Sequence, residues 1–378
     1  MPWQEQSAMN LRQEFVMFAC REGANRRELC RRYGISAKTG YKWLQRAAAE
    51  PESLLVDRSR RPHTSPTRTP ASMETMVVET RQQFPTWGGR KVHHYLVGQS
   101  VESVPHPSTI TAILHRHGLI DPEQTLTRLA PHRFEHPAPN ALWQLDFMGH
   151  LPMVTGRLHP LVLIDDHSRF ALGVWACANE QRQTVEQALT TSFQRYGLPI
   201  ALLTDNGSPW GTSGSGGITA IEVWLIRLGI QLRHGQPYHP QTQGKVERLH
   251  RTLATDVTNR QHFVDVAAAQ RAFDHWRAIY NHDRPHDALA GAPPASRYVP
   301  SLVPFPAILP SIEYEPDDEV RKVRSHGMIS FQGRDFFAGT AMKGLPVAVR
   351  PTTDDGRFTI HFCHHCLGSI DLRTPESV

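Results

Sequence analysis

The chain has few cysteines and no long apolar run, and both absences narrow what it can be. Five cysteines among 378 residues are an odd and sparse set, which argues against a disulfide framework and for a reducing compartment. No apolar run reaches the roughly 18 residues that a membrane-spanning helix needs. The first residues also lack the basic start and apolar stretch of a signal peptide. We therefore expect a cytoplasmic protein with no membrane partner.

Excess positive charge is scarce except near the N-terminus. The net charge is only +5, but residues 1–70 hold 13 Lys and Arg against 7 Asp and Glu. The remaining residues hold 28 against 29 and are nearly neutral. This distribution predicts an anionic partner for the N-terminal fifth of the chain. Nucleic acid is favoured over a membrane surface, because no strongly amphipathic basic helix accompanies the charge.

Residues 1–53 carry the pattern of a helix-turn-helix domain. Apolar residues at helical spacing predict three short helices within residues 10–49, with Gly34 ending the second and Ser36 capping the third. Trp43 and Leu44 are expected to face the core. The outer face of the third helix is expected to bind DNA through Lys38, Tyr41, Lys42 and Arg46. The alternative is a plain three-helix bundle with a solvated charged face.

Residues 54–70 have no periodicity and are rich in Pro, Ser, Thr and Arg, which predicts an extended basic linker. Three of its arginines are expected to follow a DNA groove or phosphate backbone: Arg58, Arg60 and Arg61. A linker that only adds solubility is the alternative.

Residues 71–125 form a second helical unit, whose last helix is predicted to be capped near Ser108 and to end at Gly118. The unit resembles another helix-turn-helix. Its expected outward contacts are Ser108, Thr109, Thr111, His115 and Arg116. Its net charge is near zero, so a purely structural unit is a stronger alternative here than in the first domain.

The pattern changes near residue 141. Three strand-like runs joined by turns are followed by alternating helices and strands, which predicts a mixed α/β sheet within residues 136–300. A Pro-rich linker (302–310) then leads to short strands over residues 311–378, which predict a small β-barrel-like domain. The expected fold is therefore a multidomain α/β protein with N-terminal all-α units, a mixed α/β core and a C-terminal β domain.

Three acidic residues of the core lie where phosphodiester chemistry would need them. Asp146 lies inside the first strand, Asp205 ends a later strand, and Glu247 lies near the start of a long helix. Each has an ordinary explanation on its own, such as a turn aspartate or a solvated helical ion pair. Together they can converge on two Mg²⁺ ions, because hard cations prefer carboxylate oxygens and a metal pair can serve phosphodiester cleavage.

The segments "WQLDF", "LLTDNGSPW" and "PYHPQTQGKVERLHR" resemble the catalytic motifs of the DDE integrase core, which retroviral integrases share with many insertion-sequence transposases. The N-terminal units, "DRSRRP", "IDDHSRF" and "LGSIDLR" are similar to the insertion sequence 481 family of transposases. The resemblance implies an RNase H-like core in which Asp146, Asp205 and Glu247 are the catalytic metal ligands. It implies two Mg²⁺ ions, for which Mn²⁺ can substitute, and it places Gln243, Lys245 and Arg251 at DNA ends.

The spacing of the motifs departs from the family in one place. Asp205 and Glu247 are separated by 41 residues, which is more than the common family gap. The Gly/Ser-rich segment 210–220 is expected to hold the surplus without moving the helix that carries Glu247.

Two other clusters contain residue types that can bind metal ions, but we do not expect either of them to be a metal site. Asp165 and Asp166 in "DDHSR" are expected to shape a tight turn between strands. "HFCHHC" (361–366) has a CxxC spacing but lies in a strand-like run and lacks a second ligand pair, so no zinc site is expected.

The resemblance implies a transposase that binds the terminal inverted repeats of an insertion sequence, cleaves DNA and transfers the freed strand to target DNA. Its implied partners are double-stranded DNA and further copies of the chain, bridged by DNA. The alternative is a catalytically silent DNA-binding regulator or targeting subunit. A tyrosine or serine recombinase is disfavoured, since no coherent nucleophile constellation is present.

Overall fold

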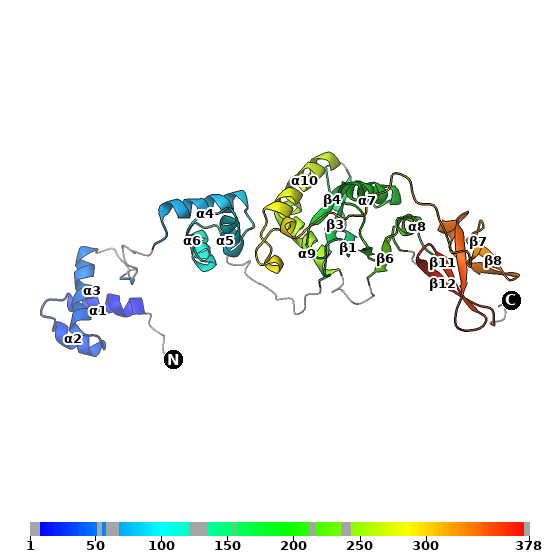
Figure 1. The fold of residues 1–378 in the computed structure, drawn as a ribbon. Helices are drawn as coiled ribbons and strands as arrows, with labels where there is room; N and C mark the ends of the chain where they lie inside the picture. Colours follow the sequence, from blue (N-terminus) through cyan, green and yellow to red (C-terminus); the bar gives the residue numbers. More distant parts are fainter. Residues whose placement is uncertain are drawn as a thin grey trace. The chain divides into compact units, whose positions relative to one another are not determined.

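The computed structural model describes residues 8–50, 55–57, 68–120, 135–154, 156–211, 217–235 and 243–373 (Figure 1). These residues fall into two compact units, residues 1–68 and 69–378. The linker arginines Arg58, Arg60 and Arg61 lie outside the described residues, as do residues 212–216 of the predicted Gly/Ser-rich loop. No helix of the described parts is long and apolar enough to cross a membrane.

The first unit contains the three predicted helices: α1 (Ala8–Ala19), α2 (Arg26–Arg32) and α3 (Ala37–Ala49). As predicted, Ser36 is the N-cap of α3, and its side chain accepts a hydrogen bond from the backbone N–H of Thr39 at 3.1 Å. Phe15, Cys30 and Trp43 are buried, one from each helix. Leu44 is only half-buried, so it covers the edge of this small core.

A close approach of α3 to the other two helices depends on Gly40. A Cβ at this position would lie 2.5 Å from Cys30 Sγ and 2.9 Å from the Phe15 ring. Only a residue without a side chain therefore allows α3 to pack this closely against α1 and α2.

The second unit begins with another three-helix group: α4 (Ala71–Gln83), α5 (Gly89–Gly98) and α6 (Pro107–Arg116). Its core includes Val77, Trp87 and Ile110. The cap of the last helix lies near Ser108, as predicted. His106 is the N-cap, and its ring accepts from the backbone N–H of Ser108. Pro107 can occupy the first helical position because that position needs no N–H donor.

A mixed sheet forms the centre of the second unit. Its strands are β1 (Trp143–Phe147), β2 (Leu151–Pro152), β3 (Arg157–Asp165), β4 (Ala171–Cys177), β5 (Ala201–Thr204) and β6 (Gln231–His234). The order is β2-β3-β1-β5-β6, with β4 paired to β3. β3 runs antiparallel to β1, β2 and β4, whereas β5 runs parallel to both β1 and β6. The predicted mixed α/β core is confirmed.

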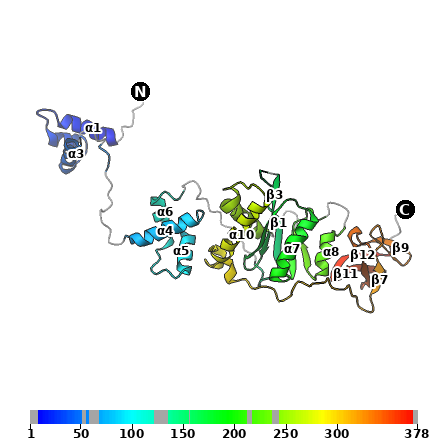
Figure 2. The same cartoon turned by 90° about the horizontal axis from the view of Figure 1, so that it is seen from above.

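Helices cover both faces of this sheet, and Figure 2 shows α7 and α10 on opposite sides of it. The covering helices are α7 (Arg182–Tyr196), α8 (Ala220–Arg227), α9 (Gly244–Leu253) with its π-helical continuation η3 (Ala254–Thr258), and α10 (Val266–His282). Alternate residues of β3 point to opposite faces. Leu161 and Leu163 pack with α7 and α8, whereas Val162 and Ile164 pack with α9 and α10. The short helices η4 (Asp287–Leu289) and η5 (Pro294–Ser296) follow α10.

The chain ends in the predicted small β domain. β7 (Glu319–Lys322), β10 (Pro346–Pro351), β11 (Arg357–Phe362) and β12 (His365–Asp371) form a sheet in the order β12-β11-β10-β7. β8 (Met328–Phe331) and β9 (Arg334–Phe337) form a separate hairpin, followed by the short helix η6 (Thr340–Met342). The core of this domain includes Val223 and Ile226 of α8, so the domain packs directly on a helix of the central α/β region.

Replacing Gly40 with alanine should destabilise the first unit by about 1–3 kcal/mol, the usual cost of overpacking. We expect a lower melting temperature for this unit in thermal unfolding of the full chain. Gly98→Ala is the matched control, since Gly98 also lies in a helix but a Cβ there meets nothing within 4 Å. Equal melting behaviour of the two variants would contradict the packing argument.

Candidate active site

Asp146 lies near the end of β1, where the strand leaves the buried core. Its neighbours Gln144 and Leu145 are buried, whereas the Asp146 side chain is 21% exposed. Burial, together with the nearby negative charges of Asp205 and Glu247, raises the pKa of the Asp146 carboxyl to about 7. The carboxyl is therefore held in a partly desolvated site that contains other negative charges.

Asp205 directly follows β5, which pairs in parallel with β1. Parallel strands place their carboxyl ends at the same edge of a sheet, so Asp205 comes to the edge where Asp146 lies. The loop after β5 orients this carboxylate. Its Oδ1 accepts from the backbone N–H of Gly207 at 3.1 Å and from the indole N–H of Trp210. Trp210 in turn stacks on Phe147 of β1, with ring centroids 5.6 Å apart.

Glu247 lies in the first turn of α9, as predicted. Val246, Leu249 and Leu253 form the buried face of this helix and pack against the sheet. Glu247 itself is exposed, but its charge contributes to the raised pKa of Asp146. Packing of α9 thus brings the third carboxylate into the electrostatic field of the other two.

The three carboxylates supply the oxygen donors that Mg²⁺ and Mn²⁺ prefer. A cation among them would also offset the repulsion that raises the pKa of Asp146. Among the described residues, however, no three His, Cys, Asp or Glu side chains are placed so that they could hold one metal ion together. The three carboxylates are therefore chemically suitable ligands for a divalent cation. They would have to move closer together to bind the same ion.

His250 is a site residue that the sequence reasoning missed. It lies one turn after Glu247 on α9, and its Nδ1 is 4.0 Å from Asp146 Oδ2. This distance suits an ion pair, but burial lowers the pKa of His250 to about 4, so the ring is neutral near pH 7. We therefore treat it as a neutral neighbour of Asp146. Its spacing of three residues from Glu247 was the available signal.

Asp165 shapes the β3–β4 turn, as predicted, whereas the side chain of Asp166 binds a segment outside this turn. Asp165 accepts from the backbone N–H groups of Asn140, at 2.8 Å, and Ser168, at 2.7 Å. Asp166 accepts from the backbone N–H of His136 at 2.8 Å. Both aspartates are almost fully buried.

The three residues expected at DNA ends have different surroundings. Arg251 is exposed on α9, and Gln243 is the half-buried residue before its first turn. Lys245 is mostly buried and forms an ion pair with Asp166. A phosphate contact by Lys245 stays a prediction, and it would have to compete with this ion pair.

The expected DNA-binding face of α3 is only partly open. Lys38, Tyr41 and Lys42 are exposed. Arg46 is half-buried, and its guanidinium lies 4.9 Å from the centroid of the Trp43 ring. Arg46 therefore packs on the domain core and presents less of its charge to solvent than the prediction assumed.

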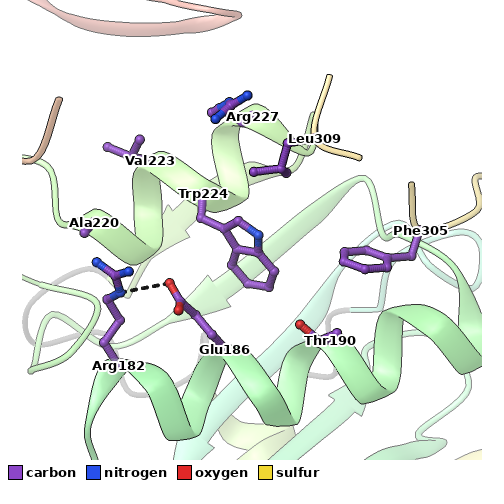
Figure 3. A pocket seen from close by; sticks show the side chains of 9 residues that line it. All are labelled: Arg182, Glu186, Thr190, Ala220, Val223, Trp224, Arg227, Phe305 and Leu309. Atoms are coloured by element: carbon purple, nitrogen blue, oxygen red, sulfur yellow. Dashed lines mark ion pairs between the residues drawn. The ribbon is translucent and has the colours of Figure 1, made fainter. Parts of the chain in front are cut away.

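A cavity of about 360 Å³ lies between α7 and α8. Figure 3 shows Trp224 and Phe305 in its wall, with the ion pair between Arg182 and Glu186 at one side. None of its lining residues belongs to the carboxylate set, so this cavity does not mark the candidate site.

Replacing Asp205 with asparagine should lower the pKa of Asp146 in the metal-free protein, because it removes a like charge. Carboxyl ¹³C chemical shifts followed through a pH titration would measure the change. Asp274→Asn, at an exposed position on α10, is the control and should leave this pKa unchanged. An unchanged pKa in Asp205→Asn would mean that the Asp205 charge does not contribute to the raised pKa of Asp146.

The same shift has a consequence for stability. The folded-state pKa of Asp146 is raised, so its contribution to stability is present below pH about 4 and is lost as the pH rises through about 7. In the metal-free protein, the free energy of unfolding of Asp146→Asn should therefore exceed that of the wild type at pH 8 but not at pH 4.

Comparisons with known families agree with the domain order. Residues 11–63 match a helix-turn-helix domain, and residues 39–114 match a homeodomain-like domain. Residues 136–240 and 228–294 match two integrase core domain families. Residues 318–377 match the C-terminal domain of IS481 family transposases.

Curated relatives include proteins of insertion elements and retroviruses. An IS407 protein of Burkholderia multivorans is 28% identical over 40% of this chain and 53% of its own length. An IS476 protein of Xanthomonas euvesicatoria is 25% identical over 61% and 66%. The Gag-Pol polyprotein of feline leukemia virus is 30% identical over 32% and 7%. The chain thus spans less than two thirds of the length of each of these relatives.

Solved structures with partial likeness include a retroviral intasome and retroviral integrase cores. A chain of a simian T-cell lymphotropic virus intasome is 17% identical, with 75% of this chain and 99% of that chain covered and a TM-score of 0.36. The catalytic core of BIV integrase is 24% identical, with coverages of 42% and 92% and a TM-score of 0.32. One chain thus carries matches to helix-turn-helix domains, to integrase core domains and to the C-terminal domain of IS481 family transposases, which is the family that the motifs predicted.

Proposed function

We propose that this chain is a DDE transposase that cleaves DNA at the ends of an insertion sequence and transfers the freed strand to target DNA. The observation that carries the proposal is geometric: β5 pairs in parallel with β1, which places Asp205 and Asp146 at one edge of the sheet, and α9, which carries Glu247, packs on this sheet within an integrase core. The negative charges of Asp205 and Glu247 also raise the pKa of Asp146. These residues come from a strand, a strand end and a helix that are far apart in sequence. Their electrostatic interaction supports the view that the three motif residues belong to one site.

Asp146 and Asp205, with Glu247 on α9, would hold two Mg²⁺ ions, or Mn²⁺ in their place. When bound, these ions would supply Lewis-acid activation for phosphodiester cleavage and for attack by the freed 3′-hydroxyl. The chain's own contribution is orientation. Trp210 and the Gly207 N–H fix the Asp205 carboxylate. Neutral His250 beside Asp146 adds no positive charge that would compete with a cation.

DNA recognition is assigned to the N-terminal helices. Exposed Lys38, Tyr41 and Lys42 on α3 would contact the terminal inverted repeats, and the second helical group would extend this contact. Exposed Arg251 would lie along DNA near the core. Two element ends must be joined to one target, so we propose a DNA-bridged assembly of several copies.

A catalytically silent DNA-binding protein is the second candidate. The observation that favours it is that no three acidic or histidine side chains among the described residues are placed to share a metal ion. The intact set of Asp146, Asp205 and Glu247 favours the enzyme, and the two candidates differ in the following test.

Asp146→Asn, Asp205→Asn and Glu247→Gln should each lower cleavage and strand transfer by about 1,000-fold or more. Loss of metal binding removes several kcal/mol of charge stabilisation, and each ~1.4 kcal/mol corresponds to a factor of ten in rate. The assay uses labelled terminal-repeat DNA with Mg²⁺ or Mn²⁺. Asp274→Asn serves as control. Full activity in all three variants with DNA binding intact would refute the proposed site. A wild-type protein that binds the repeats but shows no activity would favour the catalytically silent DNA-binding protein.

Lys42→Ala should weaken DNA binding similarly for all sequences and reduce the slope of log affinity against log salt by about 1, as expected for one lost phosphate contact. Binding titrations at several salt concentrations would measure this slope. Arg195→Ala, at an exposed position on α7, is the charge-matched control. If both variants behave alike, α3 is not the DNA-binding face.

A further inference from the structure

A buried polar network joins β1, the β3–β4 turn and the start of α9. Asp166 is 1% exposed, and its Oδ1 accepts from Gln144 Nε2 at 2.8 Å. The same oxygen faces the ammonium of Lys245 in an ion pair. Its other oxygen accepts from the backbone N–H of His136 at 2.8 Å. One carboxylate therefore binds groups from three separate segments.

Gln144 extends this network to the backbone of α9. Its Oε1 accepts from the backbone N–H of Val246 at 3.2 Å. Val246 is the third residue after the N-cap of α9, which is Gln243, and the N-cap makes no side-chain hydrogen bond to the helix. The N–H at this position is one that an N-cap side chain ordinarily satisfies. A strand residue 102 positions away in sequence thus supplies the cap.

The two ends of the network lie next to the candidate catalytic residues. Gln144 is two residues before Asp146, so both side chains leave β1 on the same side of the sheet. Lys245 and Val246 directly precede Glu247. The network therefore connects the strand that carries one acid to the helical turn that carries another.

We propose that Asp166, Gln144 and Lys245 form a clamp that fixes Glu247 relative to Asp146. The clamp rests on the proposed function for the catalytic role of Glu247. Its members are positioning residues, because they act on Glu247 through the first turn of α9. Well-packed apolar residues would stabilise such a site at least as well as a buried ion pair. A satisfied polar network instead specifies one geometry, which a shared metal site requires.

The clamp also gives Lys245 a role other than DNA binding. Its side chain is only 16% exposed, and the Asp166 carboxylate that it faces is 2% exposed. A phosphate contact would require Lys245 to leave this carboxylate. The two roles predict different responses to removal of the Lys245 charge.

The first test measures geometry without activity. Hydrogen exchange of the metal-free full chain is compared for Asp166→Asn, Gln144→Met and the unchanged chain. We expect the first turn of α9, residues 244–247, to exchange at least tenfold faster in both variants. Leu189→Ala on α7 is the control for general destabilisation, since Leu189 is fully buried but packs on the other face of the sheet. Exchange in this turn that is no faster than in the control overturns the proposal.

The second test separates positioning from DNA binding. Asp166→Asn and Lys245→Met should lower strand transfer at least tenfold and raise the Mg²⁺ concentration needed for half-maximal rate, while DNA affinity and its salt dependence stay unchanged. Leu189→Ala, assayed below its melting temperature, should keep the unchanged Mg²⁺ requirement. A salt slope that falls by about 1 in Lys245→Met would instead make Lys245 a phosphate contact and overturn its role in the clamp.

The two tests also separate this proposal from the proposed function. If the unchanged chain shows no strand transfer with Mg²⁺ or Mn²⁺, the proposed function fails, and hydrogen exchange alone decides whether the clamp holds α9. If the unchanged chain is active but the clamp variants keep its rate and Mg²⁺ requirement, the clamp fails and the proposed function stands.

Discussion

Packing of α9 on the central sheet is the interaction on which the candidate site depends. Val246, Leu249 and Leu253 are fully buried, and each such side chain contributes about 1.5–3 kcal/mol relative to exposure. This apolar contact offsets the cost of bringing a negatively charged turn toward Asp146 and Asp205. Without it, mutual repulsion and solvation would favour separation of the three acids.

Holding Asp146, Asp205 and Glu247 near one another lowers the stability of the fold, but it provides oxygen donors for a divalent cation. The pKa of Asp146, raised to about 7 by burial and by Asp205 and Glu247, means that ionising this group opposes folding above pH about 4. Such a conflict between local stability and global fold is expected at a functional site. Elsewhere in the core, buried charges are compensated, as the Asp166–Lys245 pair shows.

Much of the fold follows from local patterns. Helical periodicity predicted α3, and Ser36 caps α3 as its sequence context indicates. The turn role of Asp165 also followed from its position before "HSR". These features depend on neighbours a few residues away, so the sequence carries them directly.

The main feature that the sequence did not reveal is a long-range pairing. Asp166 and Lys245 are 79 positions apart, and nothing local indicates that Lys245 turns toward the β3–β4 turn. The packing of the Arg46 guanidinium on the Trp43 ring was also not foreseen, and a DNA contact by Arg46 stays a prediction. A tertiary contact of this kind depends on side chains that no local pattern brings together.

The segment that carries Glu247 is held at both ends by aspartates, of which Asp166 is buried and Asp256 is half-buried. Asp166 and Gln144 bind its first turn. At the other end, Asp256 of η3 accepts from Thr86 Oγ1 at 2.6 Å, Trp276 Nε1 at 3.0 Å and Arg284 at 2.9 Å.

Thr86 lies between α4 and α5, so its hydrogen bond to Asp256 connects the second helical group to η3 and α9, the helical segment that carries Glu247. Burial and the charge of Arg284 lower the pKa of Lys91 in α5 to about 8, which shows that this junction is also partly desolvated. The second helical group and the central sheet are therefore both joined by hydrogen bonds to the helical segment that carries Glu247.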